Sequence, residues 1–125
     1  MAAAEKMFES ERDGDVLLVT PTGDLHELDY PDVAAAAKDV LGLLKGGDVR
    51  HVILDFRETD YFGSTALGFF VQLWNRVRRR QGNMAFCNLS DAEKEILKVT
   101  KLDDLWPICP SREEALKAVR APEGA

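Results

Sequence analysis

The chain has 125 residues, of which 46% are hydrophobic and 30% charged, a length and composition typical of one globular domain. Its formal net charge of −6 argues against a nucleic-acid-binding protein, because neutralising phosphates requires a basic face. No apolar run is long enough to span a membrane, and the first residues lack the pattern of a signal peptide, so we expect a cytoplasmic protein.

Two strands, a hairpin turn and a helix are predicted in the first part of the chain. Residues 7–12 and 15–21 have the composition of strands, and Asp13-Gly14 between them is a strong turn signal. A helix is then predicted from a cap at Asp29 to about Leu44, where a glycine pair ends it.

The rest of the chain alternates strands with helices. A compact apolar run at 51–56 is typical of a central strand with both faces covered. It is followed by an amphipathic helix at about 64–80, whose apolar residues recur every three or four positions. We then expect a strand at 84–88, a helix from Ser90 to Lys98 with Glu93 completing a capping box, a short strand at 105–108 and a last helix capped by Ser111.

This order of elements predicts an α/β fold in one domain. Strands that alternate with helices after an opening hairpin imply a mostly parallel sheet of four to five strands, with an antiparallel edge strand and about four helices. We expect the domain to span residues 1–120, with a flexible tail at 121–125. In such a sheet, the loops at the carboxyl ends of the strands are the natural place for a functional site.

One of these loops leads to two hydroxyls at the start of a helix. Ser64 and Thr65 follow the strand at 51–56 and open the helix at 64–80. A hydroxyl at this place can cap the helix, which contributes about 1 kcal/mol. It can also carry a phosphate beside free backbone N–H groups and the positive end of the helix dipole. The residues alone leave both roles open, and one side chain can serve both.

The sequence lacks the patterns of a catalytic or metal-binding site. A serine nucleophile needs a base, yet the only histidines are His26 and His51, and the G-x-S-x-G, P-loop and G-x-G-x-x-G motifs are missing. Cys87 and Cys109 form no C-x-x-C pair, and we expect both to be reduced thiols, with a structural disulfide as the alternative. We therefore predict a protein that is not an enzyme and needs no cofactor.

A phosphate-accepting receiver domain is another class with a small α/β fold. It needs a cluster of carboxylates at strand ends to hold Mg²⁺ around an aspartate that accepts the phosphoryl group. Asp55 and Asp60 are the candidates here, but no paired acidic residues follow the first strands. This class is therefore disfavoured.

Segments along nearly the whole chain, each weak alone, form a specific pattern together. They are the strand at 52–56 with the loop and helix start at 60–68, the segments 81–84 and 99–105, Thr22-Gly23-Asp24-Leu25, and the closing helix from 111 to 116. In this order they resemble the STAS domain of bacterial anti-sigma factor antagonists, whose early segment reads Gly-Glu-Leu-Asp.

The resemblance implies a small α/β domain that binds an anti-sigma factor with serine-kinase activity and so releases a sigma factor. In the family, the loop commonly reads Asp-Ser-Ser/Thr-Gly-Leu-Gly, and phosphorylation of the first hydroxyl after the Asp abolishes binding. Ser64 matches that hydroxyl, with Thr65 as the alternative acceptor. Gly63 stands in place of the family's Asp, Ala66 in place of its Gly, and His26 in place of the acidic residue that ends the early segment.

We expect the partner to contact the 23–29 loop and the start of the 64–80 helix. The expected contact residues are Asp24, His26, Asp60, Phe62, Gly63, Ser64 and Thr65. Two alternatives stay open: a STAS scaffold or transport-associated regulator that works without phosphorylation, and a nucleotide-binding domain that uses the same helix N-terminus. The sequence does not indicate the oligomeric state.

Overall fold

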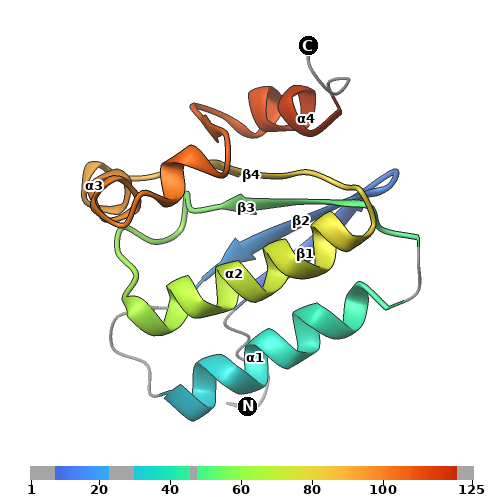
Figure 1. The fold of residues 1–125 in the computed structure, drawn as a ribbon, viewed down its shortest axis with the longest axis horizontal. Coiled ribbons are helices and arrows are strands. Elements are labelled where there is room, and N and C mark those ends of the chain that lie inside the picture. The colour runs from blue at the N-terminus through green and yellow to red at the C-terminus, as the bar shows by residue number, and fades with distance from the viewer. Residues whose placement is uncertain (1–7, 23–29, 46–47, 121–125) are drawn as a thin grey trace.

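Five strands form one sheet in the order β1-β2-β3-β4-β5 in the computed structural model, which describes residues 8–22, 30–45 and 48–120 (Figure 1). The strands are β1 (Phe8–Asp13), β2 (Val16–Pro21), β3 (His51–Asp55), β4 (Met84–Cys87) and β5 (Ile108–Cys109). β1 pairs with β2 in antiparallel fashion, and all other neighbours are parallel. The predicted mostly parallel sheet with an antiparallel edge strand is confirmed.

Four α-helices surround this sheet in the described ranges. They are α1 (Tyr30–Leu43), α2 (Ser64–Arg79), α3 (Asp91–Val99) and α4 (Arg112–Arg120), and a 3-10 helix lies at Leu102–Asp104. α1 and α2 pack against each other on one face of the sheet, and α4 packs on the other face (Figure 1). None of the helices in the described ranges is long and apolar enough to cross a membrane.

The core lies in two layers because side chains alternate along the central strands. In β2, Leu17 and Val19 face the layer formed with α1 and α2, whereas Val16 and Leu18 face the layer under α4. Every residue of β3 is buried, as the apolar run at 51–56 predicts for a strand covered on both faces.

The hairpin forms where the turn signal predicts it. Gly14 lies between β1 and β2 with φ +63°, a left-handed conformation that glycine adopts at little steric cost. The predicted cap at Asp29, the glycine pair at 46–47 and the tail at 121–125 lie outside the described residues.

The last strand differs from its prediction. A strand was expected at 105–108, but β5 comprises only Ile108–Cys109. The reason is that Leu102–Asp104 form a 3-10 turn and Trp106 is buried, with its ring stacked on Phe86 at a centroid distance of 4.9 Å. Trp106 thus fills the core from a loop, whereas Leu105 beside it is 49% exposed.

Candidate functional site

The loop at 56–63 leaves the carboxyl end of β3 and makes Ser64 the first residue of α2. The N-cap position belongs to Gly63, which is extended at φ −107° and ψ −169° and has no side-chain oxygen to offer. The first turn of α2 contains no acidic residue. This helix start therefore has no capping side chain at the N-cap and no carboxylate to offset its dipole.

Phe62 anchors the loop instead of facing a partner. Its side chain is fully buried, and its ring lies 5.2 Å from Phe56 and 5.1 Å from Phe70, measured between centroids. The expectation that Phe62 contacts a partner is therefore corrected. Its aromatic packing fixes the chain two residues before α2, so Phe62 holds the start of this helix in place from within the core.

The loop is also tied to the start of α3. The Thr59 hydroxyl donates to Glu93 Oε2 at 3.2 Å, and the Ser90 hydroxyl donates to the Asp60 carbonyl oxygen at 2.7 Å. The predicted capping box is confirmed, because Glu93 N donates to Ser90 Oγ and Ser90 N donates to Glu93 Oε1. We call these contacts of Thr59, Asp60, Ser90 and Glu93 the loop clamp.

Glu93 is the buried carboxyl group of the loop clamp. Its side chain is shielded from solvent, and this desolvation raises the pKa of the carboxyl to about 7. Hydrogen bonds from Ser90 and Thr59 act in the opposite direction, whereas the nearby Asp60 carboxylate adds to the rise in pKa. The sequence predicts the capping box, but no signal in it pairs Thr59 with a residue 34 positions away.

The surface beside Ser64 is open. Asp60 is exposed, Tyr61 is 40% exposed, and Gly63 is partly exposed. A Cβ atom built on Gly63 or on Gly68, one turn into α2, would meet no other group within 4 Å. A partner can thus approach the backbone of the helix start closely. Asp24 and His26 lie outside the described residues.

Asp55 serves the fold rather than a receiver site. It is fully buried, and its Oδ2 accepts from Arg112 Nε at 3.1 Å while its Oδ1 accepts from Asn88 Nδ2 at 2.9 Å. Arg112 also donates to Glu11 and to the Thr20 hydroxyl, so it pins α4 across three strands. Within the described ranges, no three carboxylate, histidine or cysteine side chains gather into a metal site.

His51 and Cys87 are buried, and Cys109 is partly buried against the core layer under α4. His51 Nδ1 accepts from Asn83 N at 2.9 Å, and burial lowers the pKa of its imidazole. Cys87 and Cys109 are both free thiols, as expected. Burial, followed by the charge of Asp55, raises the pKa of Cys87 to about 12, so this thiol is a poor nucleophile at neutral pH.

The sequence matches the model of the STAS domain over residues 7–115. An anti-sigma-B factor antagonist of Listeria monocytogenes is 31% identical over 98 residues, which cover 78% of this chain and 82% of that protein. The putative anti-sigma factor antagonist BtrV of Bordetella bronchiseptica is 28% identical over 57% of this chain, and the match spans only 61% of BtrV. The chain therefore belongs to the STAS domain family of anti-sigma factor antagonists.

Solved structures share the fold. An anti-sigma factor antagonist domain protein from Planctomyces limnophilus superposes with a TM-score of 0.79 at 28% identity, covering 91% of this chain and 98% of the other. The phosphorylated form of the Bacillus cell fate determinant SpoIIAA gives a TM-score of 0.71 at 19% identity, covering 90% and 99%. The expected fold class is confirmed.

Proposed function

We propose that this chain is a non-enzymatic regulatory domain that binds an anti-sigma factor with serine-kinase activity and loses this binding when Ser64 is phosphorylated. The observation that carries the proposal is the position of Ser64 as the first residue of α2, beside an exposed loop surface. The proposed partner would contact Asp60, Gly63 and the first turn of α2. Because release of a sigma factor regulates transcription, we place this function in the cytoplasm.

The electrostatics of the helix start favour a phosphate there. Phosphorylation adds about −1.5 to −2 charges at neutral pH. The positive end of the helix dipole accommodates such a charge, and no acidic residue in the first turn of α2 repels it. The domain would thus keep its fold while the surface that the partner meets becomes strongly negative. A phosphorylated form of SpoIIAA, which shares this fold, is consistent with such a change.

Gly63 gives a direct test of how a kinase recognises the site. The family's aspartate would stand at this position, and the open space and extended backbone accept an aspartate without strain. If the kinase uses a carboxylate beside the acceptor, Gly63→Asp will raise the rate of phosphorylation.

The decisive experiment incubates the protein with ATP and the anti-sigma factor kinase encoded nearest to it. Mass spectrometry then maps the phosphate, and Ser64→Ala and Thr65→Ala separate the two acceptors. We expect phosphate on Ser64, and we expect Ser64→Asp to weaken partner binding by at least about tenfold, equivalent to about 1.4 kcal/mol. Gln72→Glu adds one charge to an exposed position farther along α2 and should leave binding unchanged.

Two results would redirect the assignment. If neither Ser64 nor Thr65 takes up phosphate, and Ser64→Asp binds the partner like the wild type, the switch fails and a phosphorylation-independent STAS scaffold remains. If calorimetric titration with ATP or GTP in the absence of any kinase gives saturable heat that Ser64→Asp abolishes, the nucleotide-binding alternative is favoured.

A further inference from the structure

The two cysteines of the chain are direct neighbours across the last pair of strands. Cys87 ends β4 and Cys109 ends β5, and the two residues are partners in the parallel register. Neighbouring strands lie about 4.8 Å apart, which falls within the range of about 4.4 to 6.8 Å between the Cα atoms of disulfide-bonded cysteines. Because the chain contains only two cysteines, each is the only thiol that the other can meet within one molecule.

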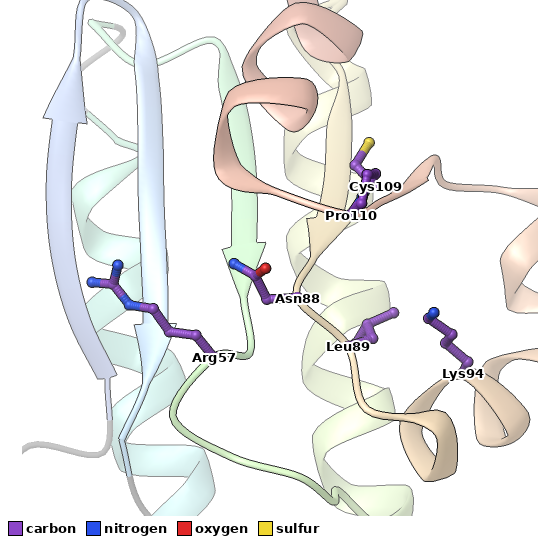
Figure 2. A pocket seen from close by; sticks show the side chains of 6 residues that line it. All are labelled: Arg57, Asn88, Leu89, Lys94, Cys109 and Pro110. Carbon is purple, nitrogen blue, oxygen red and sulfur yellow. The ribbon is translucent and has the colours of Figure 1, made fainter.

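Both cysteine side chains lie on the same face of the sheet. Cys87 belongs to the core layer under α4 and Cys109 packs against that layer, whereas Ile108 packs against the layer on the other face. Cys109 forms part of the wall of a hollow of about 460 Å³ beyond the strand ends, but its sulfur is directed away from Leu89 and Lys94 (Figure 2). The charge of a Cys109 thiolate also contributes to raising the pKa of Cys87, as expected for two sulfurs that lie close together.

The short strand β5 can adjust to bring the two sulfurs into bonding distance. Both thiols are free in the structure. β5 is a two-residue strand at the edge of the sheet, and its backbone accepts from β4 through Phe86 N to Pro107 O at 3.0 Å and Asn88 N to Cys109 O at 3.3 Å. A small shift of such an edge strand disturbs fewer contacts than a shift of a central strand would.

The segments that follow the two cysteines both hold the buried Asp55 carboxylate. Asn88, directly after β4, donates to Asp55 Oδ1 at 2.9 Å, and Arg112, at the start of α4, donates to Oδ2 at 3.1 Å. The backbone N–H of Arg57, at the start of the 56–63 loop, donates to Oδ1 at 3.1 Å. A covalent bond between the ends of β4 and β5 would thus join the two segments that hold this carboxylate and, through it, the start of the loop.

We propose that Cys87 and Cys109 form a reversible disulfide under oxidising conditions, and that this bond fixes the edge strand β5 to β4. Cys109 reacts first, because it is partly exposed whereas Cys87 is fully buried. With hydrogen peroxide as the oxidant, the Cys109 sulfur attacks one peroxide oxygen, the O–O bond breaks, and a sulfenic acid and one water form. The Cys87 sulfur then attacks the Cys109 sulfur, the S–O bond breaks, and the hydroxyl leaves as a second water with the Cys87 proton. The two thiols thus give two electrons to one peroxide.

The surroundings of the two thiols favour a bond that forms slowly and persists. Burial raises the pKa of Cys87 to about 12, and burial followed by the charge of Glu114 raises the pKa of Cys109. Little thiolate is therefore present at neutral pH, so oxidation is slow. The same property protects the product, because a thiol of high pKa is a poor leaving group when a disulfide is reduced. The bond should thus accumulate during sustained oxidation rather than respond to a brief pulse of peroxide.

The test treats the full-length chain with hydrogen peroxide, blocks the remaining thiols with N-ethylmaleimide, and records the intact mass. We expect a monomer that takes up no maleimide, and dithiothreitol should restore both labels. The bond should also raise the midpoint of thermal unfolding by about 5 °C or more, because it closes a loop of roughly 20 residues. The double variant Cys87→Ser and Cys109→Ser, treated in the same way, corrects this midpoint for the oxidation of methionines.

Ile108→Cys combined with Cys109→Ser is the matched control. It keeps one thiol on β5 but moves it by one residue to the opposite face of the sheet, against the layer of α1 and α2. Under conditions that join the wild-type pair, this variant should form no disulfide within one chain. The proposal fails if the wild-type thiols stay labelled, if they link only two chains together, or if a sulfinic acid forms without a disulfide. It also fails if the displaced pair joins as fast as the native one.

Discussion

Glu93→Gln should change how the stability of this domain depends on pH. The Glu93 carboxyl has a pKa of about 7 in the folded chain, above its usual value of 4.5, because burial disfavours the charged form. The folded state therefore holds a proton that the unfolded chain releases between these two values. Stability from this group is fully present below pH 4.5 and declines as the pH rises through 7.

The size of the effect follows from the two pKa values. Integrated from pH 5 to pH 8, the titration of Glu93 lowers the free energy of unfolding by about 2.5 kcal/mol, at about 1.36 kcal/mol per pK unit. A glutamine removes this titration yet suits the same partners. Its oxygen can accept from the Ser90 backbone N–H, and its amide can donate to the Thr59 hydroxyl.

The assay is urea denaturation across this pH range, followed by tryptophan fluorescence, for the wild type, Glu93→Gln and the control Glu95→Gln. Glu95 is an exposed carboxylate on the same helix. His51 has a lowered pKa and favours the folded state at higher pH, but it is present in all three proteins and cancels in their differences. The stability of Glu93→Gln relative to wild type should rise by about 2.5 kcal/mol from pH 5 to pH 8. A flat difference, or the same rise in Glu95→Gln, would refute the reasoning.

Two further predictions concern packing. Arg112→Ala should lower the free energy of unfolding by about 3 kcal/mol, because it leaves the buried Asp55 carboxylate without its ion-pair partner. Adding Asp55→Asn to this variant should recover part of that loss. Strictly additive losses in urea denaturation would contradict the pairing. Gly82→Ala should cost about 2 kcal/mol because a Cβ would overlap the Arg50 carbonyl, whereas Gly68→Ala, in open space on α2, should gain about 0.5 kcal/mol. Thermal melts that shift in the same direction for both variants would be inconsistent with this difference.

The elements with long periodic patterns were predictable from the sequence. The stripe of Phe69, Phe70, Leu73 and Val77 predicts α2 within one residue of its observed end, because burial of one helix face leaves a period of three to four. The central strands follow from apolar runs in the same way. The place of Ser64 at the start of α2 could be predicted because it depends only on where the preceding strand and loop end.

Contacts between distant segments could not be predicted. The sequence offers Phe62 and Tyr61 as equivalent aromatic residues of one loop, yet the first is fully buried and the second 40% exposed. Asp55 has the local setting of a site residue, and only its pairing with Arg112, 57 positions away, shows that it is structural. These partners come together only when the sheet is assembled, and the periodicity of the sequence does not indicate them.

The two outer strands of the sheet also protect the domain from aggregation. β1 is exposed from Glu9 to Asp13 and carries three carboxylates and an arginine there, and β5 is only two residues long. If a strand from another molecule paired with the sheet, it would lie against charged side chains at the β1 edge. At the β5 edge it would find too few backbone N–H and C=O groups for stable pairing. The loop proposed to bind a partner can thus be open and accessible, while the described sheet edges offer little template for unwanted pairing.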